Sequence, residues 1–175
     1  QPNQISTLIL PADVSWGEGG KAISDFSQPE APTAPEETVN KIADVLKKSG
    51  KKVAILLGRR VILEEGLLAA SKISEATGAK LFTEVFPTRL QRGAGLPNVE
   101  RIAYLAEMAA VQLSGYDHLI LIDAKAPVSF FAYPDKKSYL VPDDCELHNL
   151  VELEEDAMTS LDALVSAVGA TDTVP

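Results

Sequence analysis

Charged side chains follow three apolar runs of this sequence, and each run has the composition of a buried strand. The charged segments are Gly58-Arg59-Arg60, Thr88 to Gly95 and Asp123-Ala124-Lys125. In an open parallel sheet, ligands bind just beyond the carboxyl ends of the strands. Each segment is therefore a candidate binding site, and the arginines favour an anionic ligand.

The first candidate is Gly58 with its neighbours Arg59 and Arg60. A glycine at this point allows a phosphate to approach the backbone, and either arginine supplies the charge that would hold it. The dinucleotide fingerprint requires several spaced glycines, whereas two arginines follow Gly58. The competing interpretation is that Gly58 makes a tight turn from a strand into a helix, and both interpretations stay open.

The second candidate is a basic loop that carries Arg89, Arg92, Gly93 and Gly95 within an otherwise acidic chain. We expect this loop to bind an anionic ligand. A surface loop that makes salt bridges to a neighbouring domain explains the same residues.

The third candidate begins at Asp123, directly after an apolar run. Asp123 is placed to accept hydrogen bonds from a ribose hydroxyl pair, and Lys125 to meet a phosphate. A cap on the turn that follows explains Asp123 equally well. Together the three candidates predict these cofactor-binding residues: Gly58, Arg59, Arg89, Gly93, Gly95, Asp123 and Lys125.

Other side chains that often do chemistry show no catalytic or metal-binding pattern. His118 and His148 stand alone in strand-like runs without the spacing of metal ligands, so we interpret both as core or edge histidines. Cys145 follows two aspartates, which give its thiol no reason for a lowered pKa. We predict no catalytic residue and no metal site in this chain.

The composition restricts the class of partner. The 175 residues fit one globular domain, and the net charge of −9 argues against a nucleic-acid partner. The single cysteine excludes a disulfide within the chain and agrees with a reducing compartment. Because no apolar run approaches the length of a membrane span, we expect a cytoplasmic protein without a membrane partner.

Strand-like and helix-like segments alternate along the chain. Apolar runs predict strands at 53–57, 80–85, 118–122, 139–141 and 146–150. Helical spacing of apolar residues predicts helices at 36–49, 63–77, 99–113 and 154–168. The alternation predicts an α/β fold, a three-layer Rossmann-like domain with a mainly parallel sheet of five or six strands.

Several segments, taken in order, resemble the central domain of thiamine-diphosphate enzymes. Leu8 to Val14 is similar to the exit of the pyrimidine-binding domain that precedes it, and Val53 to Gly58 to its own first strand and turn. Gly78 to Leu81 resembles its second strand, and Tyr116 to Ile122 a later one. Asp123 to Val128 resembles the Gly-Ala-Pro-Val stretch of benzoylformate decarboxylase-like members. The resemblance covers roughly residues 5 to 150, and the nearest subgroup is the acetolactate synthase large subunits.

The resemblance implies a parent enzyme that uses thiamine diphosphate and Mg²⁺ to decarboxylate 2-keto acids, often with ligation to a second carbonyl compound. In this family the activating glutamate and the Gly-Asp-Gly metal motif belong to the flanking domains, so both should lie outside this chain. Acetolactate synthases hold FAD in the central domain, and some relatives hold an adenine nucleotide such as ADP. Here Arg59 and Arg60 replace a glycine-rich turn and Asp123 stands where a glycine is usual, which departs from the FAD-binding pattern.

The resemblance also divides the chain. Residues 1–16 are the tail end of the pyrimidine-binding domain, with a strand at 5–10, and residues 17–36 are a linker rich in glycine and proline. Residues 37–168 are the central domain, of the DHS-like NAD/FAD-binding type, and residues 169–175 are a frayed tail. Because the chain does not begin with Met, we expect it to be part of a longer polypeptide.

The resulting hypothesis is a non-catalytic central domain of an acetolactate synthase-like enzyme, inactive alone. It would act as a scaffold, a subunit interface and a holder of a nucleotide. Its partners would be the other domains and subunits of a homo-oligomeric parent. The alternatives are an independent NAD- or FAD-binding domain of an oxidoreductase or sirtuin-like protein, and a purely structural interaction module.

Overall fold

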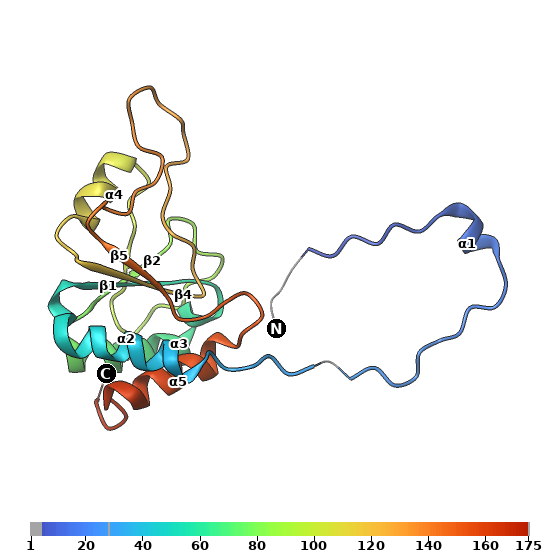
Figure 1. Ribbon diagram of the computed structural model, residues 1–175, viewed down its shortest axis with the longest axis horizontal. Helices are drawn as coiled ribbons and strands as arrows, with labels where there is room; N and C mark the ends of the chain where they lie inside the picture. The colour runs from blue at the N-terminus through green and yellow to red at the C-terminus, as the bar shows by residue number, and fades with distance from the viewer. Residues whose placement is uncertain (1–4, 28, 175) are drawn as a thin grey trace.

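The computed structural model describes residues 5–27 and 29–174. Its folded part is built around a five-stranded sheet (Figure 1). The strand order is β3-β2-β1-β4-β5, and every neighbouring pair is parallel. The strands are β1 (Val53–Leu57), β2 (Lys80–Thr83), β3 (Glu100–Arg101), β4 (His118–Ile122) and β5 (Glu146–Asn149). The predicted α/β fold with a mainly parallel sheet of five or six strands is confirmed, with five strands.

Helices cover both faces of the sheet, which gives the predicted three layers. Helices α2, α3 and α5 pack on one face, and α4 packs on the other. The helix bounds are α1 (Ala12–Trp16), α2 (Glu36–Ser49), α3 (Glu64–Thr77), α4 (Ala106–Leu113) and α5 (Ala157–Val168). A short 3-10 turn, η2 (Arg59–Ile62), connects β1 to α3.

Strand β1 separates two hydrophobic cores. Val53, Ile55 and Leu57 point into the core beneath α2, α3 and α5. Ala54 and Leu56 point into the smaller core beneath α4. All five side chains of β1 are buried, so the strand is an unbroken run of apolar residues. This run is the reason why the strand could be predicted from the sequence.

Helix α5 begins at a side-chain cap. The Asp156 carboxylate accepts hydrogen bonds from the N–H groups of Thr159 at 2.8 Å and Met158 at 2.9 Å. These bonds satisfy donors that the first turn of a helix leaves free, and they hold the pKa of Asp156 below its usual range. The predicted start at residue 154 is therefore early, because the acidic residues before α5 precede the helix.

The predicted helix at 99–113 is wrong in its first half. Glu100 and Arg101 form the edge strand β3, which pairs with Phe82 and Thr83 of β2. Helix α4 begins only at Ala106. The helical spacing of the apolar residues was misleading here, because pairing with the sheet outweighs a local periodic pattern.

Two further predicted strands do not form. Residues 5–10 are irregular and lie in a wide excursion away from the sheet (Figure 1), and no strand among residues 5–27 and 29–174 pairs with them. Residues 139–141 contribute a single antiparallel bridge, between Tyr139 and Val128. In both segments the composition suits a strand, but neither segment forms a continuous ladder with another described part of the chain.

The predicted domain boundaries at residues 16, 36 and 168 stay predictions. Beyond α5, Ala170 is fully buried and its N–H donates to the carbonyl oxygen of Val165 at 2.9 Å. The Lys72 ammonium donates to the carbonyl oxygen of Thr171 at 3.0 Å. The first residues of the predicted tail are thus attached to the domain.

Candidate functional site

Arg59 and Asp123 meet where the strand order reverses, at the carboxyl ends of β1 and β4. The guanidinium of Arg59 lies 3.3 Å from the Asp123 carboxylate, and the Arg60 N–H donates to the same carboxylate at 3.5 Å. Arg59 and Asp123 both have positive φ, 42° and 50°. Open α/β sheets bind ligands at this switch point. Here the two predicted site residues pair with each other.

The pairing occupies both oxygens of Asp123. Oδ1 faces Arg59, and Oδ2 accepts from the backbone of η2. Burial raises the pKa of Asp123, against the opposing pull of Arg59 and Arg60. The carboxylate caps the turn after β1 rather than the turn that follows Asp123 itself, and a ribose hydroxyl would have to displace these contacts.

Gly58 is required by a close backbone approach. A Cβ atom at this position would lie 2.4 Å from the carbonyl oxygen of Asp123 and 3.1 Å from the Cα atom of Ala124. The space that the missing side chain leaves is therefore filled by the chain that follows β4. A phosphate has no room on that side of Gly58.

A small cleft of about 240 Å³ opens beside the Arg59–Asp123 pair. Lys125 lies on its wall, and the Lys125 N–H donates to the Glu84 carboxylate at 3.3 Å. Glu84, at the end of β2, was not predicted. Because the cleft contains charges of both signs, it has no strong preference for an anion.

A larger cleft of about 740 Å³ lies at the carboxyl ends of β2 and β3. Three arginines, Arg89, Arg92 and Arg101, line it, and we call it the arginine cleft. In the described part of the chain no carboxylate lies within ion-pair distance of these guanidinium groups. Unpaired arginines that converge on one cleft favour a phosphate or carboxylate ligand.

Aromatic rings form one wall of the arginine cleft. Phe86 and Tyr104 line it, and their ring centroids lie 5.9 Å apart. Rings of this kind offer a flat apolar face for stacking, next to the three positive charges. An anion with an attached ring system, such as a nucleotide, fits this combination of groups.

The loop at 88–97 has a defined shape. Gly93 and Gly95 adopt positive φ, 151° and 85°, and the N–H of Gln91 donates to the carbonyl oxygen of Ile62 at 3.2 Å. The Gln91 side chain accepts from the N–H of Glu64, at the start of α3. The two glycines thus shape the loop, while Arg89 and Arg92 supply the charges in the cleft.

The seven predicted residues do not form one site. Arg59, Asp123 and Lys125 lie around the small cleft, and Arg89 lies in the arginine cleft. Arg101 was missed because the sequence placed it in a helix. If Glu100 and Arg101 had been predicted as an edge strand, the position of Arg101 at the end of that strand would have marked it as a candidate binding residue.

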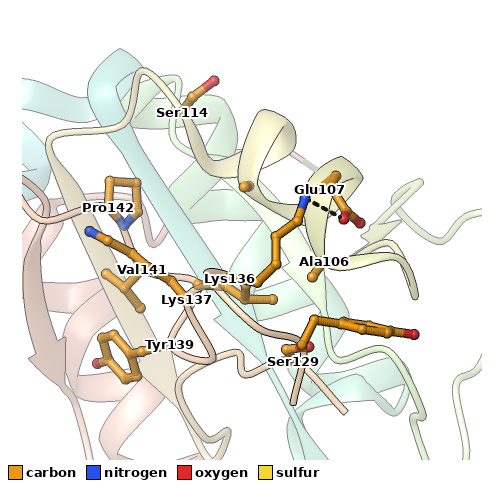
Figure 2. A pocket seen from close by; sticks show the side chains of 12 residues that line it. Ala106, Glu107, Ser114, Ser129, Lys136, Lys137, Tyr139, Val141 and Pro142 are labelled. Atoms are coloured by element: carbon orange, nitrogen blue, oxygen red, sulfur yellow. Dashed lines mark hydrogen bonds and ion pairs between the residues drawn. The ribbon is translucent and has the colours of Figure 1, made fainter. Parts of the chain in front are cut away.

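A third cavity, of about 310 Å³, lies between α4 and the segment from Ser129 to Pro142 (Figure 2). Its walls include Ala110 and Val141. The ammonium of Lys136 reaches Glu107 at 3.0 Å, and the dashed line of Figure 2 marks this ion pair. No local pattern of residues indicates this cavity, because its wall is an irregular excursion of the chain.

The two histidines, predicted to stand alone, lie against each other. His118 Nδ1 is 3.2 Å from His148 Nε2, and Glu146 lies beside both rings. His148 is buried on the edge strand β5, as expected of a core or edge histidine, but the prediction that the two histidines stand alone is wrong. The spacing Glu146-x-His148 places these two side chains on one face of a strand, but only the register of β5 against β4 brings His118 to them.

Cys145 lies close to this cluster in sequence. Burial raises the pKa of its thiol, and the carboxylates of Asp144 and Asp117 add to the effect. A thiol with a raised pKa has little thiolate at neutral pH. The prediction of an unreactive thiol agrees with these surroundings.

The five-stranded parallel sheet with helices on both faces defines a Rossmann-like α/β domain. Over 150 residues the chain is 51% identical to the Mycobacterium tuberculosis protein "Putative acetolactate synthase large subunit IlvX". This match covers 86% of the chain and 28% of that protein. The chain is thus a homologue of one part of an acetolactate synthase-like large subunit, and the resemblance expected from the sequence is confirmed.

A solved structure shows the same fold. The crystal structure of a "putative thiamin diphosphate-dependent enzyme" from Mycobacterium smegmatis matches with a TM-score of 0.61 at 17% identity. The match covers 86% of this chain and 31% of that one, so the chain spans less than a third of either relative. No protein-family model matches. Among the described residues, no helix has the length and hydropathy that a membrane crossing requires.

Proposed function

We propose that this chain is the central domain of an acetolactate synthase-like protein, where it acts as a scaffold and contact surface and contributes no catalytic group. The observation that carries the proposal is the match to less than a third of a longer relative. The parent would be a homo-oligomeric cytoplasmic enzyme that uses thiamine diphosphate with Mg²⁺ to decarboxylate a 2-keto acid. These cofactors would be held by its other domains.

Exposed apolar side chains support a role in contacts. Trp16 is 86% exposed and Phe26 81% exposed, and most of the apolar residues before α2 are similarly open to water. A second group of exposed rings, Phe86, Tyr104 and Phe130, lies at the carboxyl edge with centroids 5.1–5.9 Å apart. Contiguous exposed apolar surface of this kind marks a contact with another domain or subunit.

The arginine cleft supports the role of nucleotide holder. Its volume of about 740 Å³ falls in the range of small-molecule sites, and it joins three arginines to two aromatic rings. ADP fits this chemistry better than FAD, because the crowded backbone at Gly58 blocks the turn where a dinucleotide would place its diphosphate. Arg89, Arg92 and Arg101 would hold the phosphates, and Tyr104 or Phe86 would stack on the base.

The scaffold role is tested with Trp16, the chain's single tryptophan. Its fluorescence should be that of a water-exposed indole in the 175-residue chain and should shift to the blue in the full-length protein. Equal emission in both would contradict a buried contact there. With thiamine diphosphate, Mg²⁺ and pyruvate, the full-length protein should release CO₂ and the 175-residue chain should not.

Thermal-shift titrations with ADP, FAD and NAD test the nucleotide role. A ligand at 100 times its Kd adds about 2.7 kcal/mol of stability. We expect a shift with ADP. A shift with NAD alone would favour the alternative, an independent oxidoreductase-type or sirtuin-like domain, and no shift with any of the three would leave a purely structural module.

A further inference from the structure

Three ligand-type side chains converge at the amino ends of β4 and β5. His118 is the first residue of β4 and pairs in register with Glu146, the first residue of β5. His148 lies two residues further along β5, so it points to the same face as Glu146. We call these three residues the His–Glu–His cluster, and each can offer one atom so that the three atoms lie within 4.8 Å of one another.

The spacing of these atoms approaches that of a tetrahedral metal site. His118 Nδ1 and His148 Nε2 are 3.2 Å apart. Glu146 Oε2 lies 3.6 Å from His118 Nδ1, and Glu146 Oε1 lies 3.9 Å from His148 Nε2. Zn–N and Zn–O bonds of about 2.0–2.1 Å place tetrahedral ligands about 3.3–3.4 Å apart. The two nitrogens already have this separation.

Glu146 needs only a small adjustment to complete the set. Its side chain is 55% exposed, so the carboxylate is free to rotate and bring one oxygen closer to both rings. The Lys41 ammonium of α2, 3.5 Å from Glu146 Oε1, is the group that competes with a cation. Lys41 is itself 66% exposed, so it has room to move into the solvent when a cation enters.

The surroundings of the rings suit a ligand role. The His148 side chain is nearly buried and the His118 side chain is mostly covered, while the Glu146 side of the cluster opens to solvent. The open side leaves a place for a water molecule as the fourth ligand.

We propose that His118, Glu146 and His148 form a binding site for one divalent transition-metal ion, with Zn²⁺ the best match. The set of two imidazoles and one carboxylate plus water is a known zinc coordination. The hydrogen bond between the two rings requires one nitrogen to carry a proton, and that proton moves to the outer nitrogen of the same ring when the metal binds.

The bound ion would stabilise the pairing of the edge strand β5 with β4. Strand β5 has four residues and reaches the sheet after a long irregular excursion from β4. A metal bound to His118 on β4 and to both ligands on β5 would join the two strands directly. The site lies at the end of the strands opposite the arginine cleft, so it does not depend on the proposed nucleotide.

The test is Zn²⁺ titration of the 175-residue chain, produced without a polyhistidine tag and stripped with chelator. The chain contains two histidines, both in the cluster, so bound Zn²⁺ has few alternative partners. We expect one Zn²⁺ per chain and a rise in Tm of about 5–10 °C at 100 times Kd. Mg²⁺ should bind far more weakly, because imidazole ligands do not suit it.

Three variants locate the site. His148→Ala and Glu146→Gln should each weaken Zn²⁺ binding at least about tenfold. Cys145→Ser is the matched control, because it changes the adjacent potential ligand and should leave the affinity unchanged. Since His148 is buried, circular dichroism without metal must show that its variant is folded, and the exposed Glu146→Gln variant tests the site independently.

Cadmium-113 NMR gives a direct readout of the bound atoms. One-bond couplings should appear to Nδ1 of His118 and to Nε2 of His148. Absence of Zn²⁺ binding to the wild-type chain would overturn the proposal. So would unchanged affinity in Glu146→Gln, loss of binding in Cys145→Ser, or cadmium couplings to other nitrogens.

Discussion

The two ends of the sheet differ in how their charged residues are arranged. At the carboxyl end, Arg59 and Asp123 neutralise each other, and Arg89 belongs to a separate cleft. At the amino end, His118, Glu146 and His148 come together although 30 residues separate the two histidines. The predicted site is thus spread out, whereas the cluster that was not predicted is compact.

The difference shows what places side chains together. Residues in loops after strands share an edge of the sheet, but each loop folds according to its own turns and contacts. Residues on neighbouring strands are fixed by register, so His118 and Glu146 must be adjacent once β4 pairs with β5. Side chains on neighbouring strands are therefore brought together by the pairing itself, whereas side chains in neighbouring loops are not.

The largest expected effect of a substitution at the carboxyl ends of the strands is the loss of stability caused by a change at Gly58. Gly58→Ala should lower the free energy of unfolding by about 2–3 kcal/mol, because the added methyl group would collide with the Asp123 carbonyl oxygen, 2.4 Å away. Gly95→Ala is the control: it has positive φ but open space, and should lose only about 1 kcal/mol. Urea denaturation measures both, and equal losses would mean that the approach of Asp123 to Gly58 is easily relaxed.

Charge-reversal substitutions distinguish the arginine cleft from the small cleft beside the Arg59–Asp123 pair as the nucleotide site. Arg92→Glu should weaken ADP binding at least about tenfold, or 1.4 kcal/mol, since it replaces attraction to phosphate by repulsion. Lys125→Glu, in the small cleft, should change ADP binding little. Calorimetric titration checks both. The opposite result would place the nucleotide at the switch point between β1 and β4.

Asp156 and Asp123, both near the carboxyl ends of the strands, should have opposite effects on folding stability as pH falls. The Thr159 and Met158 N–H groups lower the pKa of Asp156, so its stabilisation is present above the pKa of an unfolded aspartate and is lost as pH falls through the folded value. Burial raises the pKa of Asp123, so protonation favours the folded state as pH falls through its folded value.

Asp156→Ala should therefore lower stability by about 1 kcal/mol at neutral pH and by less in acid. Asp156→Asn keeps an oxygen that can cap the helix and should recover part of the loss. Urea denaturation at several pH values provides the measurement. A loss for Asp156→Ala that grows toward acid pH would contradict the role of the ionised cap.

The smallest effect is expected from Lys41 at the amino end. Its ion pair with Glu146 is exposed, so Lys41→Ala should change the free energy of unfolding by less than about 0.5 kcal/mol. The same change removes the cation beside the His–Glu–His cluster and should raise Zn²⁺ affinity severalfold. Lys48→Ala, on the same helix but paired with Asp44, is the control for unspecific charge effects. Equal Zn²⁺ affinity in both variants would count against a metal position beside Glu146.

Local sequence patterns are sufficient to predict the central strands and most helices. The runs at Val53–Leu57 and His118–Ile122 are buried on both faces, so their apolar character follows from local composition alone. Helix α2 matches its prediction at both ends, because its apolar stripe and Gly50 are local signals. The resemblance to acetolactate synthase-like large subunits also came from the order of such segments.

Which side chains contact one another depends on how distant segments pair and pack. Glu100 and Arg101 became a strand because β2 offered a free edge, which no local pattern encodes. Asp123 caps the turn after β1, from a position 64 residues beyond Arg59 in sequence. The His–Glu–His cluster depends on the register of β5 against β4. Pairing between distant strands is a property of the whole chain, so the spacing of residues along the sequence does not reveal it.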